Sequence, residues 1–140
     1  MLNGFYAATE AAVAPHGPIR IKYTADEALL VFAAPGPAIA AARAIREALA
    51  PHLAPFGLSA GFGIHGGPVI EGLLGSESVK AFDVLGDTVN VAKRLCDGAA
   101  GGEILVSGET PVVDAGGAPV RELRVKGKAQ PLLVRVIATP

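Results

Sequence analysis

The sequence predicts an α+β domain in which helices pack on one mostly antiparallel β-sheet. Pairs of short apolar segments with strand-like alternation are separated by segments with helical spacing, in the order α-ββ-α-ββ-βα-β-ββ. The chain has 140 residues, of which 51% are hydrophobic and 18% charged, so it can bury one core. We therefore expect a single domain over residues 1–140.

The N-terminal half is predicted to contain two helices and one strand pair. Pro15 ends the first helix, and a tight polar turn with Asp26 at its tip joins the two strands. We expect Pro35-Gly36-Pro37 to break the chain before the second, Ala-rich amphipathic helix. The expected elements are helices over 2–14 and 38–50 and strands over 19–24 and 28–33.

The C-terminal half is predicted to consist mainly of strands around one further helix. This helix begins after Gly86, where the side chain of Asp87 or Thr88 can cap its free N–H groups. The expected strands cover 58–64, 69–74, 81–85, 103–107, 120–125 and 132–137.

The composition excludes several classes of protein. A net charge of −1 gives no bulk electrostatic reason to bind nucleic acid or an anionic membrane. The apolar runs are too short to span a membrane, and no signal-peptide pattern precedes the first helix. The single cysteine, Cys96, cannot support an intramolecular disulfide framework and is typical of a reducing, cytoplasmic location.

The stretch from Lys80 to Asp97 contains the main group of candidate functional residues. Asn90 and Arg94 are four residues apart, so they share one helix face with Asp87, and the apolar Val89, Ala92, Leu95 and Cys96 can pack on the other. Asp83 could accept from an exocyclic amine, Asn90 could hold a sugar oxygen and Arg94 could neutralise phosphate. The spacing alone favours a simpler interpretation, in which Asn90 and Arg94 are the solvated side of an ordinary amphipathic helix.

This stretch resembles the signature of the class III nucleotidyl cyclases, in which a strand ending in Asp leads through G-[DN]-T-V-N-x-A-x-R into a helix. The other matches follow in the family's order and cover nearly the whole chain. They are K-Y-T-A-D-E-A-L-L-V-F from Lys22, G-I-H-G-G-P-V-I-E-G-L-L-G-S from Gly63, G-E-I-L-V-S from Gly102 and V-K-G-K from Val125. The resemblance implies a ferredoxin-like sandwich.

The resemblance also implies roles for single residues. Lys22 and Asp83 would read the base and select ATP, Asn90 would orient the ribose, Arg94 would stabilise the α-phosphate and Lys126 would hold the terminal phosphates. The implied reaction is attack of the ribose 3′-oxygen on the α-phosphate, which converts ATP to 3′,5′-cyclic AMP and pyrophosphate.

The same resemblance implies that Asp26 is one of two aspartates that hold a pair of Mg²⁺ or Mn²⁺ ions. In the family each active site lies at the interface of a head-to-tail dimer, so a homodimer is implied. Without the family, Asp26 reads as a turn residue, Lys22 as a solvated strand residue and Lys126 as part of an exposed turn.

The chain departs from the family at two places. Ala25 stands where the family has Gly before the metal aspartate. A first strand of the F-x-D-[IM]-x-G-F type, which carries the other metal aspartate and is central in the family's sheet, has no counterpart here, so the domain reads as N-terminally incomplete. We expect its absence to leave apolar surface and unpaired backbone.

Three functions follow from these observations. The first is an adenylyl cyclase whose turnover is very weak, because a single Asp should hold the metal pair poorly. The second is a non-catalytic or truncated cyclase-homology module that dimerises or binds nucleotide without turnover. The third, a structural α+β domain without a ligand, is disfavoured by the length of the motif from Asp83 to Arg94.

Overall fold

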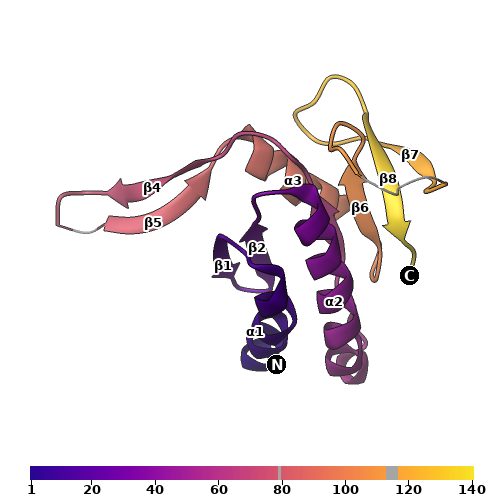
Figure 1. Cartoon of the computed structure of the whole chain (residues 1–140), viewed down its shortest axis with the longest axis horizontal. Helices are drawn as coiled ribbons and strands as arrows, with labels where there is room; N and C mark the ends of the chain where they lie inside the picture. The colour runs from indigo at the N-terminus through magenta and orange to yellow at the C-terminus, as the bar shows by residue number, and fades with distance from the viewer. Residues whose placement is uncertain (79, 113–116) are drawn as a thin grey trace.

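The computed structural model describes residues 1–78, 80–112 and 117–140, except for the side chains of residues 74 and 80–83. It confirms the α+β class (Figure 1). The helices are α1 (Leu2–Val13), α2 (Pro35–Leu53) and α3 (Asp87–Gly98). The strands are β1 (Arg20–Thr24), β2 (Glu27–Val31), β3 (Phe62–Ile64), β4 (Ile70–Gly75), β5 (Lys80–Leu85), β6 (Ile104–Ser107), β7 (Val120–Leu123) and β8 (Leu132–Ala138).

The strands form three separate sheets rather than the expected continuous one. Two are antiparallel hairpins, β1-β2 and β4-β5, and the third has the order β3-β6-β8-β7. Within the described residues, β2 pairs only with β1, and β3 pairs only with β6. Each of these two strands therefore has one unpaired edge, and helix α2 connects them in the chain. Unpaired strand backbone was expected from the sequence, and the described residues contain it at β2 and β3.

A large apolar groove accompanies these free edges. Its volume is about 850 Å³, and its lining comes from α1, α2 and α3 and from strands β1, β2, β3 and β5. Apolar residues of α2 such as Ala42 and Ile45 face it together with Val89, Ala92 and Cys96 of α3. The expected exposed apolar surface is therefore present as a groove.

The core consists of two clusters. In one, Val13 of α1 packs with Ile45 and Leu49 of α2. In the other, Val91 and Leu95 of α3 pack on Leu105, Val134 and Val136 of β6 and β8. This second cluster fixes α3 to the larger sheet, and so determines where the other faces of α3 point.

Proline positions explain where the observed helices differ from the expected ones. α2 begins at Pro35, because a proline in the first turn lacks only an N–H that would have no helical partner. It also continues through Pro51 to Leu53.

The expected capping of α3 by Asp87 or Thr88 is wrong: Gly86 is the N-cap, and the hydroxyl of Thr88 donates to the Pro68 carbonyl at 2.6 Å.

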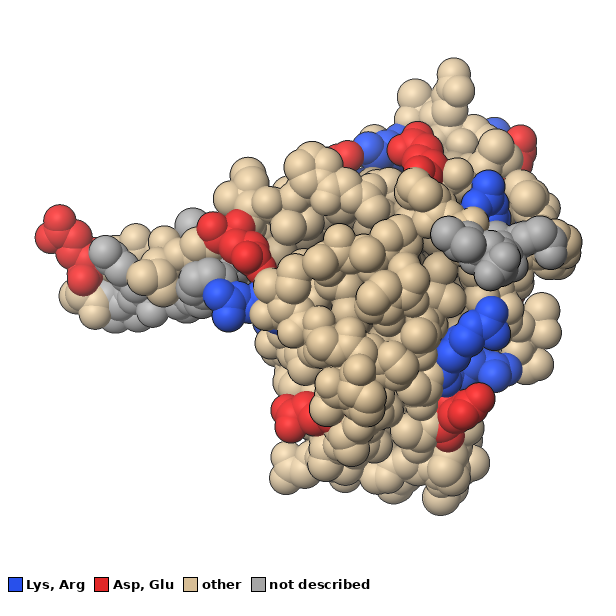
Figure 2. Space-filling view, viewed as in Figure 1, with Lys and Arg blue, Asp and Glu red and all other residues tan. Residues whose placement is uncertain are grey.

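The β4-β5 hairpin projects from the body as an arm (Figure 1). Ile70 and Leu73 on this arm are 67% and 64% exposed. On the face shown in Figure 2, charged side chains of both signs are scattered, with broad uncharged areas between them. Among the described residues, no helix has both the length and the apolar character needed to cross a membrane.

Candidate functional site

Helix α3 presents a polar face beside its buried one. Val91 and Leu95 are 3% and 0% exposed, whereas Asn90 is exposed and Arg94 is half-buried. Because Asn90 and Arg94 lie one turn apart, their side chains leave the helix on the same side. The structure therefore brings together the amide and the guanidinium that the sequence indicated.

The β7-β8 loop, residues 124–131, lies against this face. Gly127 has φ of 85°, and a Cβ built there would be 3.2 Å from Nη2 and 3.3 Å from Nη1 of Arg94. Glycine suits this position, because it adopts positive φ without strain and leaves room for the guanidinium. The Arg94 guanidinium therefore packs on the Gly127 backbone, next in the chain to the exposed Lys126.

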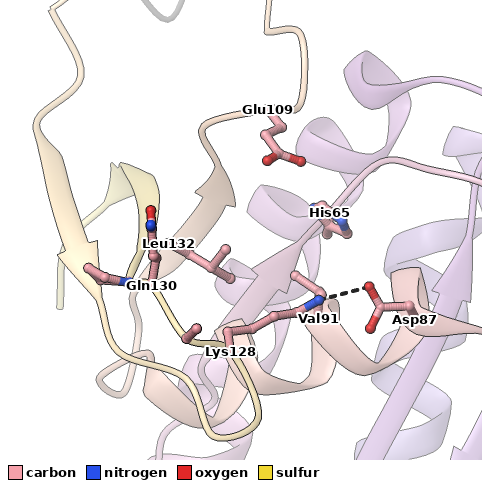
Figure 3. Close-up of a pocket in the computed structure, with 9 residues that line it drawn as sticks. His65, Asp87, Val91, Glu109, Lys128, Gln130 and Leu132 are labelled. Carbon is pink, nitrogen blue, oxygen red and sulfur yellow. Dashed lines mark hydrogen bonds and ion pairs between the residues drawn. The ribbon is translucent and has the colours of Figure 1, made fainter.

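An ion pair joins the same loop to the first turn of α3. Nζ of Lys128 donates to Oδ2 of Asp87 at 2.9 Å, across a pocket of about 350 Å³ (Figure 3). This hydrogen bond and the attraction of the Lys128 charge lower the pKa of Asp87, and Arg94 adds to the effect. Asp87 is thus paired with Lys128 and feels the charge of Arg94 without an ion pair to it.

His65 also lines this pocket, between Glu109 and Asp87 in the view of Figure 3. Nδ1 of His65 is 2.6 Å from Oγ of Ser107, which is 2.6 Å from Oγ1 of Thr110. Thr110 in turn accepts from the N–H of Gly66 at 3.0 Å. Burial lowers the pKa of His65, and nearby Glu109 and Asp87 act in the opposite direction.

Lys22 and Asp26 lie in a different hollow. Lys22 is on β1 opposite Leu29, Asp26 is at the exposed tip of the β1-β2 hairpin, and both line the apolar groove. The groove and the smaller pocket share only His65 among their lining residues. Within one chain, the structure therefore does not bring Lys22 and Asp26 into one pocket with the residues around Asp87 and Lys128.

The expected base reader Asp83 lies on β5 opposite Gly72, and its side chain is outside the described part of the structure. Asp26 lies at the tip of the β1-β2 hairpin, as the sequence predicted. The roles of Lys22, Asp26, Asp83, Asn90, Arg94 and Lys126 remain predictions.

The described residues do not fit a two-metal site. No group of three or more His, Cys, Asp or Glu residues comes together in that part of the chain to hold an ion. Asp26 offers one carboxylate, and the neighbouring Glu27 is bound to Nζ of Lys93 at 3.0 and 3.1 Å. A pair of divalent cations needs several oxygen ligands, so one exposed carboxylate is insufficient.

Sequence reasoning gave no role to Lys128 or His65, although both line the pocket beside α3. The sequence did contain a signal for a role of Lys128, because V-K-G-K places one lysine on each side of a glycine. A turn there can direct one amine to the site and the other to a partner. Nothing in the sequence pairs His65 with Ser107, which is 42 residues away.

Comparison with known proteins is consistent with this geometry. Residues 20–133 match the model of the family described as adenylate and guanylate cyclase catalytic domain. The uncharacterized Mycobacterium tuberculosis protein Rv1318c is 32% identical over 148 aligned positions that cover 94% of this chain and 27% of the relative. Rv1319c of the same species is 35% identical over 104 positions, which cover 69% of this chain and 19% of the relative. The chain thus spans about a quarter or less of these relatives.

Similar solved structures are also cyclases. The guanylyl cyclase Cya2 superposes with a TM-score of 0.78 at 26% identity, over 99% of this chain and 78% of that one. The guanylate cyclase domain of RhGC from Catenaria anguillulae, in complex with GTP, superposes with a TM-score of 0.79 at 27% identity, over 99% and 82%. The chain belongs to the adenylate and guanylate cyclase catalytic domain family.

Proposed function

We propose that the chain is an adenylyl cyclase domain that binds ATP through Asn90, Arg94 and Lys126. One observation carries this proposal: Arg94 packs on Gly127 beside Lys126, and it forms no ion pair with any residue that the structure describes. An uncommitted guanidinium beside a lysine-bearing loop is suited to a polyphosphate, which offers several oxygens to both cations.

The reaction that we propose forms a bond between the ribose 3′-oxygen and the α-phosphorus. The bond from that phosphorus to the bridging oxygen of the β-phosphate breaks, the 3′-hydroxyl loses its proton, and pyrophosphate leaves. Negative charge grows on the α-phosphate oxygens and on the leaving group, where Arg94 and Lys126 would stabilise it. Asn90 would orient the ribose for attack.

The choice of ATP rests on Lys22 and Asp83. A lysine can donate to N1 of adenine and a carboxylate can accept from its 6-amino group. Guanine has a protonated N1 and a 6-oxo group. Lys22 would then place a donor against the N1–H donor, and Asp83 would place an acceptor against the 6-oxo acceptor. Because two of the structurally similar proteins are guanylyl cyclases, ATP and GTP need direct comparison.

We also propose that two copies associate head to tail in the cytoplasm, so that Asp26 of one chain faces the Arg94 site of the other. The exposed apolar side chains Ile70 and Leu73 on the projecting arm support association. Leu73→Asp should weaken the dimer in sedimentation equilibrium. Leu58→Asp, at an apolar residue that is 49% exposed outside the arm, is the control.

A non-catalytic module is the second candidate, and it is favoured because Asp26 is the one predicted metal ligand among the residues that the structure describes. In the presence of Mn²⁺ we expect ATP binding with cyclic AMP formation close to background. Such weak turnover fits both a poor cyclase and a module that binds nucleotide without converting it.

The test is calorimetric titration of the chain with ATP and GTP, together with detection of cyclic AMP by mass spectrometry. Arg94→Ala should weaken ATP binding by about tenfold or more, since it removes a charge-assisted contact. Arg43→Ala, at an exposed residue of α2, should leave it unchanged. A folded chain that binds no nucleotide would contradict the proposal, and robust Mn²⁺-dependent turnover would contradict the expected weakness and exclude the module.

A further inference from the structure

The β7-β8 loop is attached to α3 at two neighbouring points. At one, Gly127 packs on the Arg94 guanidinium, and at the other, Lys128 pairs with Asp87 (Figure 3). Lys126 lies immediately before these contacts, so its position follows that of the loop. We propose that Asp87 and Lys128 are a positioning pair, which holds Lys126 beside Arg94 and keeps Arg94 available for phosphate. This inference rests on the proposed nucleotide site.

The pair contributes little to the stability of the fold. The side chain of Asp87 is 71% exposed and that of Lys128 is 32% exposed. Exposed ion pairs of this kind add little to the free energy of unfolding, so removing one partner should leave the domain folded. An effect on the site can therefore be measured without loss of structure.

Lys128 has a second effect through charge. Asp87 lies on the first turn of α3, close enough to Arg94 for Arg94 to lower the pKa of its carboxyl. While Lys128 holds the carboxylate, Arg94 remains without an ion pair among the described residues. Without Lys128, the Asp87 carboxylate becomes an internal anion that competes with phosphate for Arg94.

These two effects predict that substitution of Lys128 weakens ATP binding more than substitution of Asp87. Asp87→Asn loosens the loop but leaves no competing anion, whereas Lys128→Met loosens the loop and frees the carboxylate to capture Arg94. The apparent Kd for ATP should rise about threefold in Asp87→Asn and about tenfold in Lys128→Met. Adding Asp87→Asn to Lys128→Met should restore the threefold level, because it removes the competitor.

The probes are ATP and inorganic tripolyphosphate, each titrated by calorimetry. Because the pair acts on the phosphate-binding groups, both ligands should lose affinity by the same factor. Lys93→Met is the matched control, because Lys93 of α3 forms an exposed ion pair with Glu27 of β2, away from the loop. It should change neither affinity.

A second readout does not depend on nucleotide. Trypsin cleavage after Arg124 and Lys126, followed by mass spectrometry, should be faster in Asp87→Asn and Lys128→Met than in the wild type and in Lys93→Met. Equal losses in the two single variants with no rescue in the double variant, or unchanged cleavage, would overturn the inference. If the wild type binds neither probe while cleavage accelerates as expected, the pair holds the loop and the proposed nucleotide site is wrong.

Discussion

At Ala25 the backbone has φ of 50°, and among the described residues it is the one non-glycine residue with positive φ. The hydroxyl of Tyr6 donates to the Ala25 carbonyl at 2.6 Å, so the turn before Asp26 is fixed from α1. The left-handed region costs an alanine about 1–2 kcal/mol. Ala25 stands where the family has Gly, and this left-handed conformation shows where the replacement has a cost.

Replacing Ala25 with Gly should therefore stabilise the domain. We expect Ala25→Gly to raise the free energy of unfolding by about 0.5–1 kcal/mol, after the greater chain entropy of glycine is subtracted. Urea unfolding followed by circular dichroism measures this change. Ala40→Gly, at an exposed position within α2, should lower stability by a similar amount. A loss of stability in both variants would contradict the strained turn.

His65 should make stability depend on pH. Burial lowers its pKa from the ordinary value of 6.5, against the attraction of Glu109 and Asp87 and together with repulsion from Lys128. The unfolded chain therefore binds a proton at a higher pH than the folded one, and stability rises as the pH increases through the range just below 6.5. In His65→Asn, whose amide can still reach Ser107, the urea midpoint should change less between about pH 5.5 and about pH 7.5. An unchanged slope would assign the pH dependence to other groups.

At the scale of elements, β3 and α3 are in direct backbone contact. A Cβ built on Gly63 would lie 2.3 Å from the N atom of Cys96 and 2.5 Å from the Ala92 carbonyl oxygen. Backbone atoms cannot move aside as a flexible side chain can. Gly63→Ala should therefore lower the free energy of unfolding by more than about 2 kcal/mol. Gly72→Ala on β4, with nothing within 4 Å of the added carbon, is the control and should change it by less than about 1 kcal/mol.

The sequence predicted most elements, and the exceptions have local physical causes. The helical spacing of α1 and the alternation in β1 and β8 depend on neighbouring residues alone, so they could be read from the sequence. Pro35 was misread because a proline can break a helix or begin one, and only the N–H pattern distinguishes the two. Residues 58–61 alternate like a strand, yet β3 begins at Phe62. Which alternating residues join a sheet depends on the partner strand, which the sequence does not specify.

For the whole molecule, the candidate site was predictable only where its residues lie close in sequence. Asn90 and Arg94 share a helix face by spacing alone. Contacts of Gly127 with Arg94 and of Lys128 with Asp87 join segments 33 and 41 residues apart, so they required the fold. Exposed apolar surface was anticipated because a central strand could be compared with the family pattern, but the sequence did not predict that this surface forms a groove between helices and strands.

The unpaired strand edges should be visible in hydrogen exchange. β6 is paired on both sides, with β3 and β8, and each of its residues is buried, whereas β2 and β3 each have a free edge at the groove. Amides of β6 should therefore exchange far more slowly than the groove-facing amides of β2 in exchange followed by NMR.

The same groove should bind an apolar dye such as 8-anilinonaphthalene-1-sulfonate, since apolar side chains of α2 and α3 line it. Equal protection of β2 and β6, with no dye fluorescence, would contradict an open groove and mean that another segment or chain covers it. Repeating both measurements on dilution would separate those two cases, because cover supplied by a second chain is lost at low concentration and cover within one chain is not.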